Sequence, residues 1–299
     1  MLLDPGILFA TLLGGLSRAM MLFLVASGLS LTFGAMNILN FAHATLWLLG
    51  GYITFSIFTL IADGMGFGDS AMVLVAAIIL GTAVLAVIGY LIERLLIRRM
   101  YDQELPEQLL LTFALILIIG DLIRLIWGVE DRSIFLPSEP LEVMGAFVNP
   151  YYFVIIATGC AIAAGLWWFL QKTRYGKIVR AAVHSREMVG ALGIRIPVIY
   201  AGVFALGVAI AAFSAGVFLP LMPMALGVDI SLIVQCFAVV VIGGFGSILG
   251  TFVASVLVGI VYAISILVWP DGALAVIFLI VVVVLIWRPW GLFGTELRF

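Results

Sequence analysis

A few polar side chains interrupt an otherwise apolar chain, and their types suit hydrogen bonding better than covalent chemistry. Asn37, Asn40 and His43 place two amides and an imidazole between two long apolar runs. Such groups need hydrogen-bond partners within a membrane, where irregular backbone is tolerated only inside protein or beside a water-filled cavity. This segment therefore marks either a helix junction, with side chains that hold the turn, or part of a route for a solute.

The second histidine does not join the first in a metal site. His184 lies far along the chain in a basic segment, and no cysteine or carboxylate cluster accompanies either histidine. Because zinc sites gather three or four nitrogen, sulfur or oxygen ligands, we expect no metal and no other cofactor in this chain. An intramembrane enzyme would need a converging nucleophile and base, and the scattered serines and two histidines offer none.

The segment 171–197 concentrates the positive charge of the chain. Ser185 is a good N-cap for a short helix over 186–192, Gly193 is suited to end that helix, and Pro197 prevents its continuation. Such a helix could fit a groove on another protein or touch anionic lipid, and the pattern leaves both readings open. The segment holds six of the fourteen Lys and Arg residues, namely Lys172, Arg174, Lys177, Arg180, Arg186 and Arg195.

Gly243, Gly244 and Gly246 interrupt another apolar run just before Ser247. Glycines here let two backbones approach closely or let the chain turn between two half-helices. The four-residue spacing from Gly246 to Gly250 also fits helix packing through small residues. The motif is not a phosphate loop, because no Gly-Lys-Ser/Thr follows it.

Two arginines lie inside apolar segments. An arginine at a membrane centre costs about 2.5 to 3.5 kcal/mol, so each needs a partner, a water-filled cavity or a route to the interface. Arg124 can reach the interface and can pair with Asp121, three positions earlier on the same helix face. For Arg18 the depth in the membrane depends on where the first span starts.

The elements that position these residues are membrane-spanning helices. Of the residues, 65% are hydrophobic and 10% are charged, and the mean hydropathy is +1.32. We therefore expect an all-α, polytopic transmembrane helical bundle that forms one domain over 1–299, with broken helices near 37–43 and 243–247. About eight spans are predicted, at 7–34, 42–61, 70–92, 108–127, 151–170, 198–219, 230–268 and 273–287.

The charges predict the orientation. Placing 93–107, 171–197 and 288–299 in the cytoplasm puts eleven of the fourteen basic residues inside, as the positive-inside rule requires. The N-terminus is then outside and the C-terminus is cytoplasmic. The opposite side receives mostly acidic residues, among them Asp4, Asp63, Asp69, Glu130, Asp131, Glu139, Glu142, Asp229 and Asp271.

Several motifs resemble one known family. The chain has Leu-Asn-Phe-Ala-His at 39–43 followed by Gly-Gly-Tyr at 50–52, and Tyr-Gly at 175–176 with Arg-Ala at 180–181. It also has Ile-Glu-Arg at 92–94, Ala-Leu-Gly-Ile at 191–194 and Ile-Gly-Gly-Phe-Gly-Ser-Ile at 242–248. Over nearly its whole length the chain resembles the LivH-type permeases of branched-chain amino acid ABC importers.

This resemblance implies a subunit that does not hydrolyse ATP itself. Its implied partners are a second permease of the LivM type or a second copy of this chain, two cytoplasmic ATP-binding subunits and a periplasmic solute-binding protein, in a bacterial inner membrane. The loop over 174–195 would dock on the ATPases. Its expected contact residues are Arg180, Ser185, Arg186, Glu187, Val189, Leu192 and Gly193, with Val189 and Leu192 as apolar knobs; the expected pathway residues are Asn37, Asn40, His43 and Gln235.

Two alternatives follow from the same residues. The breaks at 37–43 and 243–247 could be half-helices of an ion-coupled secondary transporter, which would need membrane-embedded carboxylates, yet Asp121 already has Arg124 beside it. Relatives of the same ABC class also look to serve urea, short amides and aromatic carboxylates. The family usually has Gly, and often an acidic residue, where this chain has Ala44 and Thr45, and commonly Pro where it has Leu249. A hydrophobic amino acid is the default substrate.

Overall fold

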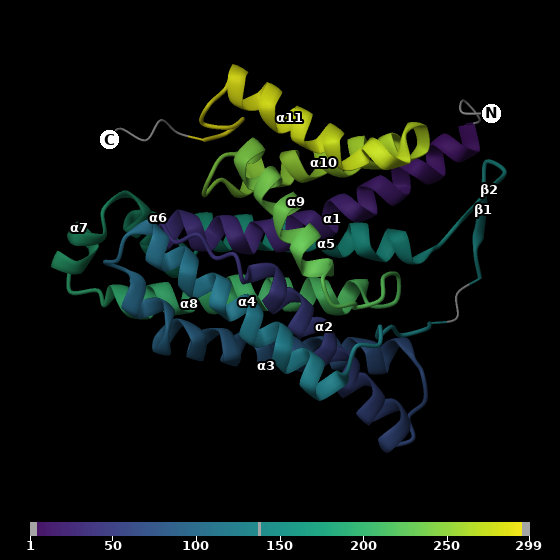
Figure 1. Ribbon diagram of the computed structural model, residues 1–299, viewed down its shortest axis with the longest axis horizontal. Helices are drawn as coiled ribbons and strands as arrows, with labels where there is room; N and C mark the ends of the chain where they lie inside the picture. The colour runs from purple at the N-terminus through teal and green to yellow at the C-terminus, as the bar shows by residue number, and fades with distance from the viewer. Residues whose placement is uncertain (1–4, 137–138, 295–299) are drawn as a thin grey trace. The chain divides into compact units, whose positions relative to one another are not determined.

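The computed structural model describes residues 5–136 and 139–294 as a helical protein (Figure 1). Short helical turns continue α2 at Leu60–Gly64, follow α3 at Ile97–Met100 and precede α11 at Pro270–Gly272. The helices in these ranges are α1 (Pro5–Met36), α2 (His43–Thr59), α3 (Ala71–Leu95), α4 (Leu105–Trp127), α5 (Tyr151–Lys172), α6 (Arg174–His184), α7 (Arg186–Ala191), α8 (Ile196–Phe218), α9 (Val228–Gly243), α10 (Ile248–Val268) and α11 (Ala273–Trp287).

The predicted all-α, polytopic architecture is confirmed. Within the described ranges, eight helices, counted with the turns that continue them, are long and apolar enough to cross a membrane, and α9 is a shorter apolar helix. Both predicted breaks are present: α1 ends at Met36 before α2 begins at His43, and α9 ends at Gly243 before α10 begins at Ile248. The protein is therefore a multi-pass membrane protein. The orientation of its termini stays a prediction.

Two details of the predicted elements need correction. Pro197 does not simply stop the preceding helix, because α8 begins at Ile196 and holds Pro197 in its first turn, where a missing N–H costs nothing. The loop after α4 also contains an unpredicted hairpin. Its antiparallel strands β1 (Leu141–Val143) and β2 (Ala146–Val148) pair Leu141 with Val148. Three-residue strands are too short for an alternation pattern to identify.

The described residues form two compact units, and α1, α5 and α9 contribute to both. Unit 1 comprises 5–30, 139–167 and 234–294. Here α10 and α11 lie side by side (Figure 1), and α1 crosses α10 closely. A Cβ added to Gly15 would lie 2.8 Å from the Ala263 Cβ, and one added to Gly259 would lie 2.6 Å from the Ala19 Cβ. Small residues thus let the two backbones approach.

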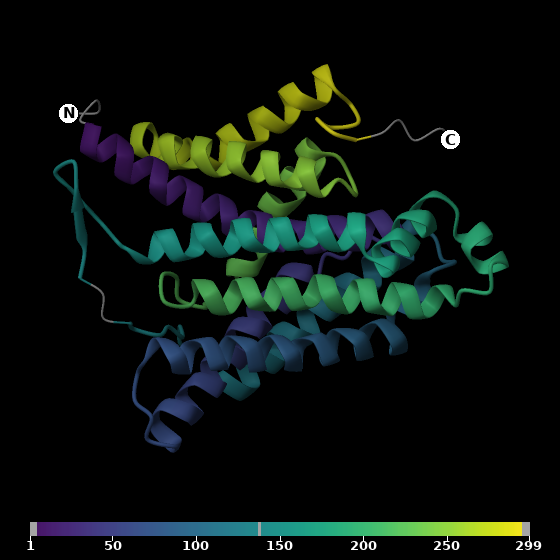
Figure 2. The same ribbon diagram turned by 180° about the vertical axis from the view of Figure 1, so that it is seen from behind.

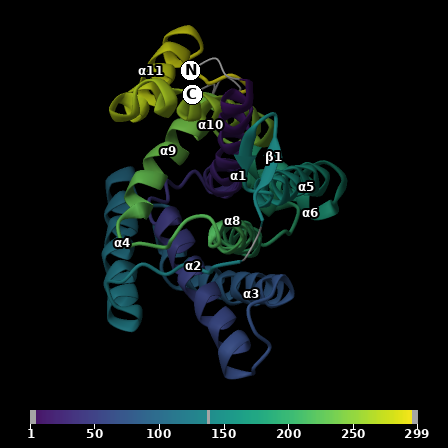
Figure 3. The ribbon, with the colours of Figure 1, turned by 90° about the vertical axis from the view of Figure 1, so that its right-hand side faces the viewer.

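Unit 2 comprises 31–136 and 168–233. Its core is the packing of α2, α3 and α8 (Figures 2 and 3). Trp47 and Tyr52 of α2 and Phe204 of α8 are among its fully buried side chains. α4 packs against α2, where Trp127 donates to the Ser56 hydroxyl at 2.6 Å. This core carries the basic loop between α5 and α8.

Candidate functional site

The basic loop folds as two short capped helices, α6 and α7. The Thr173 hydroxyl accepts from the Gly176 N–H at 3.0 Å and caps α6, and the Ser185 hydroxyl accepts from the Met188 N–H at 3.2 Å and caps α7. Gly193 follows with φ +80°, the left-handed conformation that favours glycine after a helix. The predicted cap and end of the short helix are confirmed.

The apolar face of α7 differs from the predicted one. Val189 is only 4% exposed, so its expected role as an outward knob is wrong. The outward apolar side chains are Met188, 69% exposed, and Leu192, 75% exposed. Val189 instead anchors α7 to the rest of unit 2, because burial of its side chain stabilises that position. Helical spacing alone could not tell which apolar residues of so short a helix face inward.

Arg180, Arg186 and Glu187 lie on the same loop, and the two arginines have partners within the chain. Arg180 donates to the Gln171 side-chain oxygen, and Arg186 donates to the Asp102 carboxylate at 3.3 Å. Arg186, Glu187 and Asp102 are exposed. An exposed ion pair contributes little to stability, so the Arg186–Asp102 pair can separate readily when another partner approaches.

A buried carboxylate in unit 2 was not predicted. Glu93, at the end of α3, is fully buried and accepts from Arg98 at 3.1 Å and from the Tyr101 hydroxyl. Burial, and then the hydrogen bond to Glu93, hold the pKa of Tyr101 above its usual range, so this phenol remains a donor at neutral pH. Glu93 appeared in the sequence only within a family motif, and nothing in its spacing pointed to these partners.

The segment 97–102, which follows α3, links α7 to α8 through side-chain contacts. Tyr101 packs edge-on against Tyr200 of α8, with ring centroids 5.3 Å apart, and Arg98 donates to the Pro197 carbonyl at 3.3 Å. Asp102, next to Tyr101, holds Arg186 of α7. The segment 97–102 therefore contacts the ends of α3, α7 and α8.

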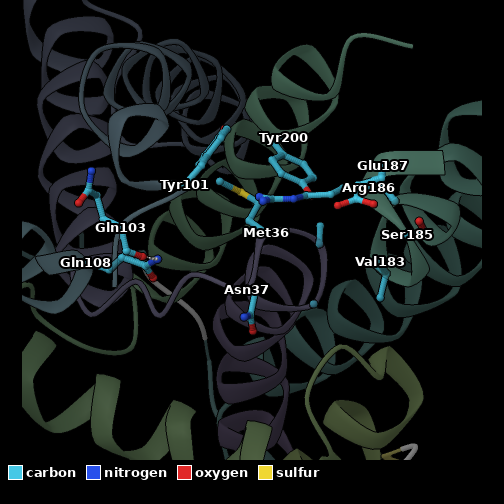
Figure 4. Close-up of a pocket in the computed structure, with 13 residues that line it drawn as sticks. Met36, Asn37, Tyr101, Gln103, Gln108, Val183, Ser185, Arg186, Glu187 and Tyr200 are labelled. Atoms are coloured by element: carbon cyan, nitrogen blue, oxygen red, sulfur yellow. Dashed lines mark hydrogen bonds between the residues drawn. The ribbon is translucent and has the colours of Figure 1, made fainter. Parts of the chain in front are cut away.

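A cavity of about 530 Å³ opens beside this segment. Gly34, Ala35, Met36 and Asn37 bring the end of α1 to its wall, and Ser185, Arg186 and Glu187 bring α7 (Figure 4). Its other lining residues are Tyr101, Gln103, Gln108, Ala182, Val183 and Tyr200.

The predicted pathway residues of the first break occupy different environments. Asn37 is exposed beside the cavity with φ +54°, a conformation that asparagine tolerates better than most residues. Asn40 is 1% exposed, and its amide has no hydrogen-bond partner among the described residues. His43 is buried at the start of α2, and its backbone N–H donates to the Asn40 backbone carbonyl at 3.3 Å. Asn40 and His43 are thus both buried beside the start of α2, whereas Asn37 lies at the cavity.

Asp229 is buried, although the charge pattern assigned it to an outer loop. Thr45 of α2 donates to its carboxylate at 2.5 Å. The Tyr52 hydroxyl donates to the Met224 carbonyl at 3.0 Å. Seven residues of α2 separate these two contacts, or about 10 Å of helix rise. The segment from Met224 to Asp229 therefore runs along α2 toward its beginning and places a carboxylate near the first break.

The second break is a tight turn between α9 and α10. Gly244 and Gly246 have φ +94° and +78°, and the Ser247 hydroxyl accepts from the Gly250 N–H at 3.1 Å to cap α10. A Cβ added to Gly250 would lie 2.0 Å from the Gly243 carbonyl oxygen. The close pair is therefore Gly243 and Gly250, whereas the predicted packing of Gly246 with Gly250 is wrong, because Gly246 belongs to the turn.

Gln235, the fourth predicted pathway residue, partners an intramembrane arginine. Its side-chain oxygen accepts from the Arg18 guanidinium at 2.8 Å in unit 1. The other intramembrane arginine, Arg124, lies 3.6 Å from Asp121, and both are exposed, so that predicted pair is confirmed. Within the described ranges no three His, Cys, Asp or Glu residues gather as a metal site would need.

The fold defines a multi-pass helical membrane protein whose charged helical loop stands apart from its apolar spans. Residues 11–286 match the family model for the permease component of the branched-chain amino acid transport system, and the chain belongs to this family. The chain is 27% identical to the high-affinity branched-chain amino acid transport system permease protein BraD of Pseudomonas aeruginosa, over 95% of this chain and 94% of that protein.

Two further relatives carry similar names. The chain is 29% identical to the high-affinity branched-chain amino acid transport system permease protein LivH of Escherichia coli K12, over 91% of this chain and 90% of that protein. It is 23% identical to the probable branched-chain amino acid transport permease protein LivH of Methanocaldococcus jannaschii, over 83% of this chain and 78% of that protein. The resemblance to LivH-type permeases is therefore confirmed.

Proposed function

We propose that this chain is the transmembrane permease subunit of a binding-protein-dependent ABC importer and forms its translocation pathway. The proposed solute is a small organic molecule, by default a branched-chain or other hydrophobic amino acid. The observation that carries the proposal is the match to branched-chain permeases over nearly the full length of both chains. The proposed setting is a bacterial inner membrane, with the N-terminus outside and the C-terminus in the cytoplasm.

The proposed partners supply what this subunit needs for active transport. Two cytoplasmic ATP-binding subunits bind and hydrolyse ATP, a periplasmic protein delivers the solute, and a second permease, of the LivM type or a copy of this chain, completes the pathway. This chain is not the enzyme of the assembly. Candidate pathway residues are Asn40 and His43 with Thr45 and Asp229, which lie near the first break in unit 2.

The proposed ATPase-docking surface is α7 with its exposed neighbours. Met188 and Leu192 provide an apolar contact, because exposed large apolar side chains beside charged ones mark protein interaction sites. Arg186 and Glu187 provide polar contacts at its edge, where an ATPase carboxylate can replace Asp102 as the partner of Arg186. Ser185 and Gly193 shape the helix between them.

The proposed route for the motion starts at α7 and passes through the segment 97–102. When an ATPase carboxylate replaces Asp102 as the partner of Arg186, the segment 97–102 is released from α7, and Tyr101 and Arg98 carry its displacement to the buried Glu93 and to Pro197. α3 and α8, which pack closely along their lengths, then move together. A buried charged network suits this role, since it holds one geometry until a partner is displaced.

Reconstitution tests the proposed function. The tagged chain, expressed with candidate ATPases and a second permease, should copurify with two ATPase subunits and should take up radiolabelled leucine in proteoliposomes when binding protein and ATP are present.

Leu192→Asp should abolish ATPase copurification, because it puts a charge into an apolar contact. Phe135→Asp, also at a highly exposed apolar residue, is the matched control and should preserve it. Normal assembly and coupled ATPase activity of Leu192→Asp would overturn the docking surface, and ion-driven leucine uptake without ATPases would overturn the importer.

A further inference from the structure

Arg18 is a charged side chain inside the membrane-spanning part of unit 1. It lies on α1, its Nη2 donates to the Gln235 side-chain oxygen at 2.8 Å, and its guanidinium carbon lies 3.9 Å from the centre of the Tyr262 ring. Gln235 belongs to α9 and Tyr262 to α10. Three helices thus converge on one cation.

In the described part of the chain this cation has no anionic partner. Among the described residues no Asp or Glu forms an ion pair with Arg18, and its Nε is buried without a hydrogen-bond partner. Gln235 accepts a hydrogen bond from the guanidinium, and Tyr262 presents the face of its ring to it. Both side chains are neutral, so neither compensates the charge of Arg18. An arginine inside a membrane is costly to insert, and one without an ion-pair partner indicates a functional site.

The cluster lies well away from the ends of its helices. Gln235 lies seven residues after the start of α9, and Tyr262 lies six residues before the end of α10. Both distances correspond to about 10 Å of helix rise, against a hydrocarbon layer of about 30 Å. Arg18, thirteen residues from the start of α1, lies about 20 Å along that helix. Arg124, by contrast, lies three residues from the end of α4, from where its side chain can reach the interface.

The close crossing of α1 and α10 holds the cluster in one geometry. Gly15 and Ala19 on α1 meet Ala263 and Gly259 on α10, so the contact flanks Arg18 on both sides. The Tyr262 ring supports the guanidinium, which is planar and keeps its remaining N–H donors in its own plane. A preorganised guanidinium fork is the geometry that binds a carboxylate through two parallel hydrogen bonds.

We infer that Arg18, supported by Gln235 and Tyr262, binds the carboxylate of the solute during its passage. This inference rests on the proposed function and narrows its substrate class to carboxylate-bearing solutes. Urea and simple amides have no carboxylate to neutralise the cation, so a site of this chemistry disfavours them. Arg18 and Gln235 act as binding residues, and Tyr262 acts as a positioning residue.

Uptake by the complete transporter is the first test. In proteoliposomes with ATPases and binding protein, Arg18→Met should lower the leucine uptake rate about ten- to a hundredfold, because it removes hydrogen bonds from a charged group. Arg18→Lys, which keeps the charge but not the fork, should fall between Arg18→Met and wild type. Arg124→Met, at an exposed arginine, is the matched control and should stay within about twofold of wild type. Wild-type uptake by Arg18→Met would overturn the inference.

A binding test separates this inference from the proposed function. The purified full chain in nanodiscs, with its copurifying subunits and without binding protein, is heated with isovalerate or with isovaleramide, which share a carbon skeleton. Isovalerate alone should raise the unfolding midpoint, and Arg18→Met, but not Arg124→Met, should abolish the shift. An equal shift with the amide, or a shift that persists in Arg18→Met, would contradict a carboxylate site.

Two further outcomes are decisive. If wild-type transporter takes up no leucine but shows the Arg18-dependent isovalerate shift, the site stands and the proposed substrate fails. If Arg18→Met no longer copurifies with the second permease, Arg18 pairs with a carboxylate of that subunit, and the inference is overturned. Loss of the fold does not complicate these tests, since replacing an intramembrane cation by methionine removes an insertion cost.

Discussion

Single polar residues carry most of the chemistry of this chain, and Glu93 illustrates how they do so. Its buried carboxylate accepts from Arg98 and Tyr101, and through them it is connected to Pro197 and Tyr200 at the start of α8. Breaking a buried pair by removing one partner is strongly destabilising, because the remaining charge loses its compensation. The network therefore keeps the segment 97–102 in place beside α7.

Tyr101→Phe tests this network. The variant should lose about 1 to 3 kcal/mol of unfolding free energy at neutral pH, because a buried carboxylate loses a donor. The raised pKa of Tyr101 means that the folded protein holds this proton more tightly than the unfolded chain. The contribution is therefore complete below about pH 10 and is lost as pH rises beyond it.

Thermal or denaturant unfolding between pH 7 and pH 11 gives the measurement. Wild-type stability should fall more steeply above about pH 10 than that of Tyr101→Phe. Tyr90→Phe, at an exposed tyrosine of α3, should keep the wild-type slope. Identical slopes for Tyr101→Phe and wild type would show that folding does not raise the pKa of Tyr101.

Residue chemistry was predicted only where a local pattern indicated it. The Ser185 cap and the Asp121–Arg124 pair depend on neighbours three positions away, so the sequence was enough. Thr45 and Asp229 meet through tertiary packing, and Glu93 meets Arg98 and Tyr101 only because the chain turns after α3; helical spacing encodes neither contact. The outward direction of Leu192 and the inward direction of Val189 were likewise decided by packing.

At the level of elements, α7 is short enough to depend on its ends. A six-residue helix makes few internal hydrogen bonds, and Ser185 at one end and Gly193 at the other satisfy groups that would otherwise lack partners. Ser185→Ala should destabilise α7 by about 1 kcal/mol, seen as faster hydrogen exchange of the Met188 amide. Ser185→Asp, which keeps an N-cap acceptor, should preserve the exchange rate; equal rates for Ser185→Ala and wild type would contradict the cap.

The second break depends on glycine at two facing positions. Gly243→Ala would place its Cβ 2.5 Å from the Gly250 backbone carbon, so the turn between α9 and α10 would have to open. We expect a loss of about 1 to 3 kcal/mol or more in unfolding free energy, as for other overpacked sites. Gly165→Ala on α5 meets nothing within 4 Å and should be neutral or stabilising, by up to about 1 kcal/mol. Equal stability of both variants would show that the turn has room for a side chain.

At the level of the whole molecule, apolar length predicted the spans well. Each of the eight predicted apolar segments contains a helix, because a helix that satisfies its own backbone is the only way a single apolar segment can cross the membrane. The hairpin β1–β2 and the inward course of Met224 to Asp229 were missed, since segments of so few residues are too short to show a periodicity or a membrane-spanning apolar run. The predicted single domain over 1–299 and the predicted sides of the loops stay predictions.

Cysteine labelling tests those sides. In a chain with Cys160 and Cys236 replaced, Glu142→Cys should react with a membrane-impermeant maleimide in intact cells, whereas Lys177→Cys should react only after permeabilisation. Both positions are exposed, so both variants should label in detergent, which serves as the control. Labelling of Lys177→Cys in intact cells would reverse the predicted orientation.

The hydrogen bonds that close the second break have a consequence for how the protein is made. The Leu292 and Phe293 N–H groups donate to the Ile242 and Gly243 carbonyls, at 2.8 and 3.1 Å, so the end of α9 is completed by residues about fifty positions later. While the ribosome is still producing α10 and α11, those two carbonyls lack their native donors. The turn at Gly243 must therefore be among the last parts of the permease to mature, and a chain truncated after Trp287 would insert its spans yet leave this turn unfinished.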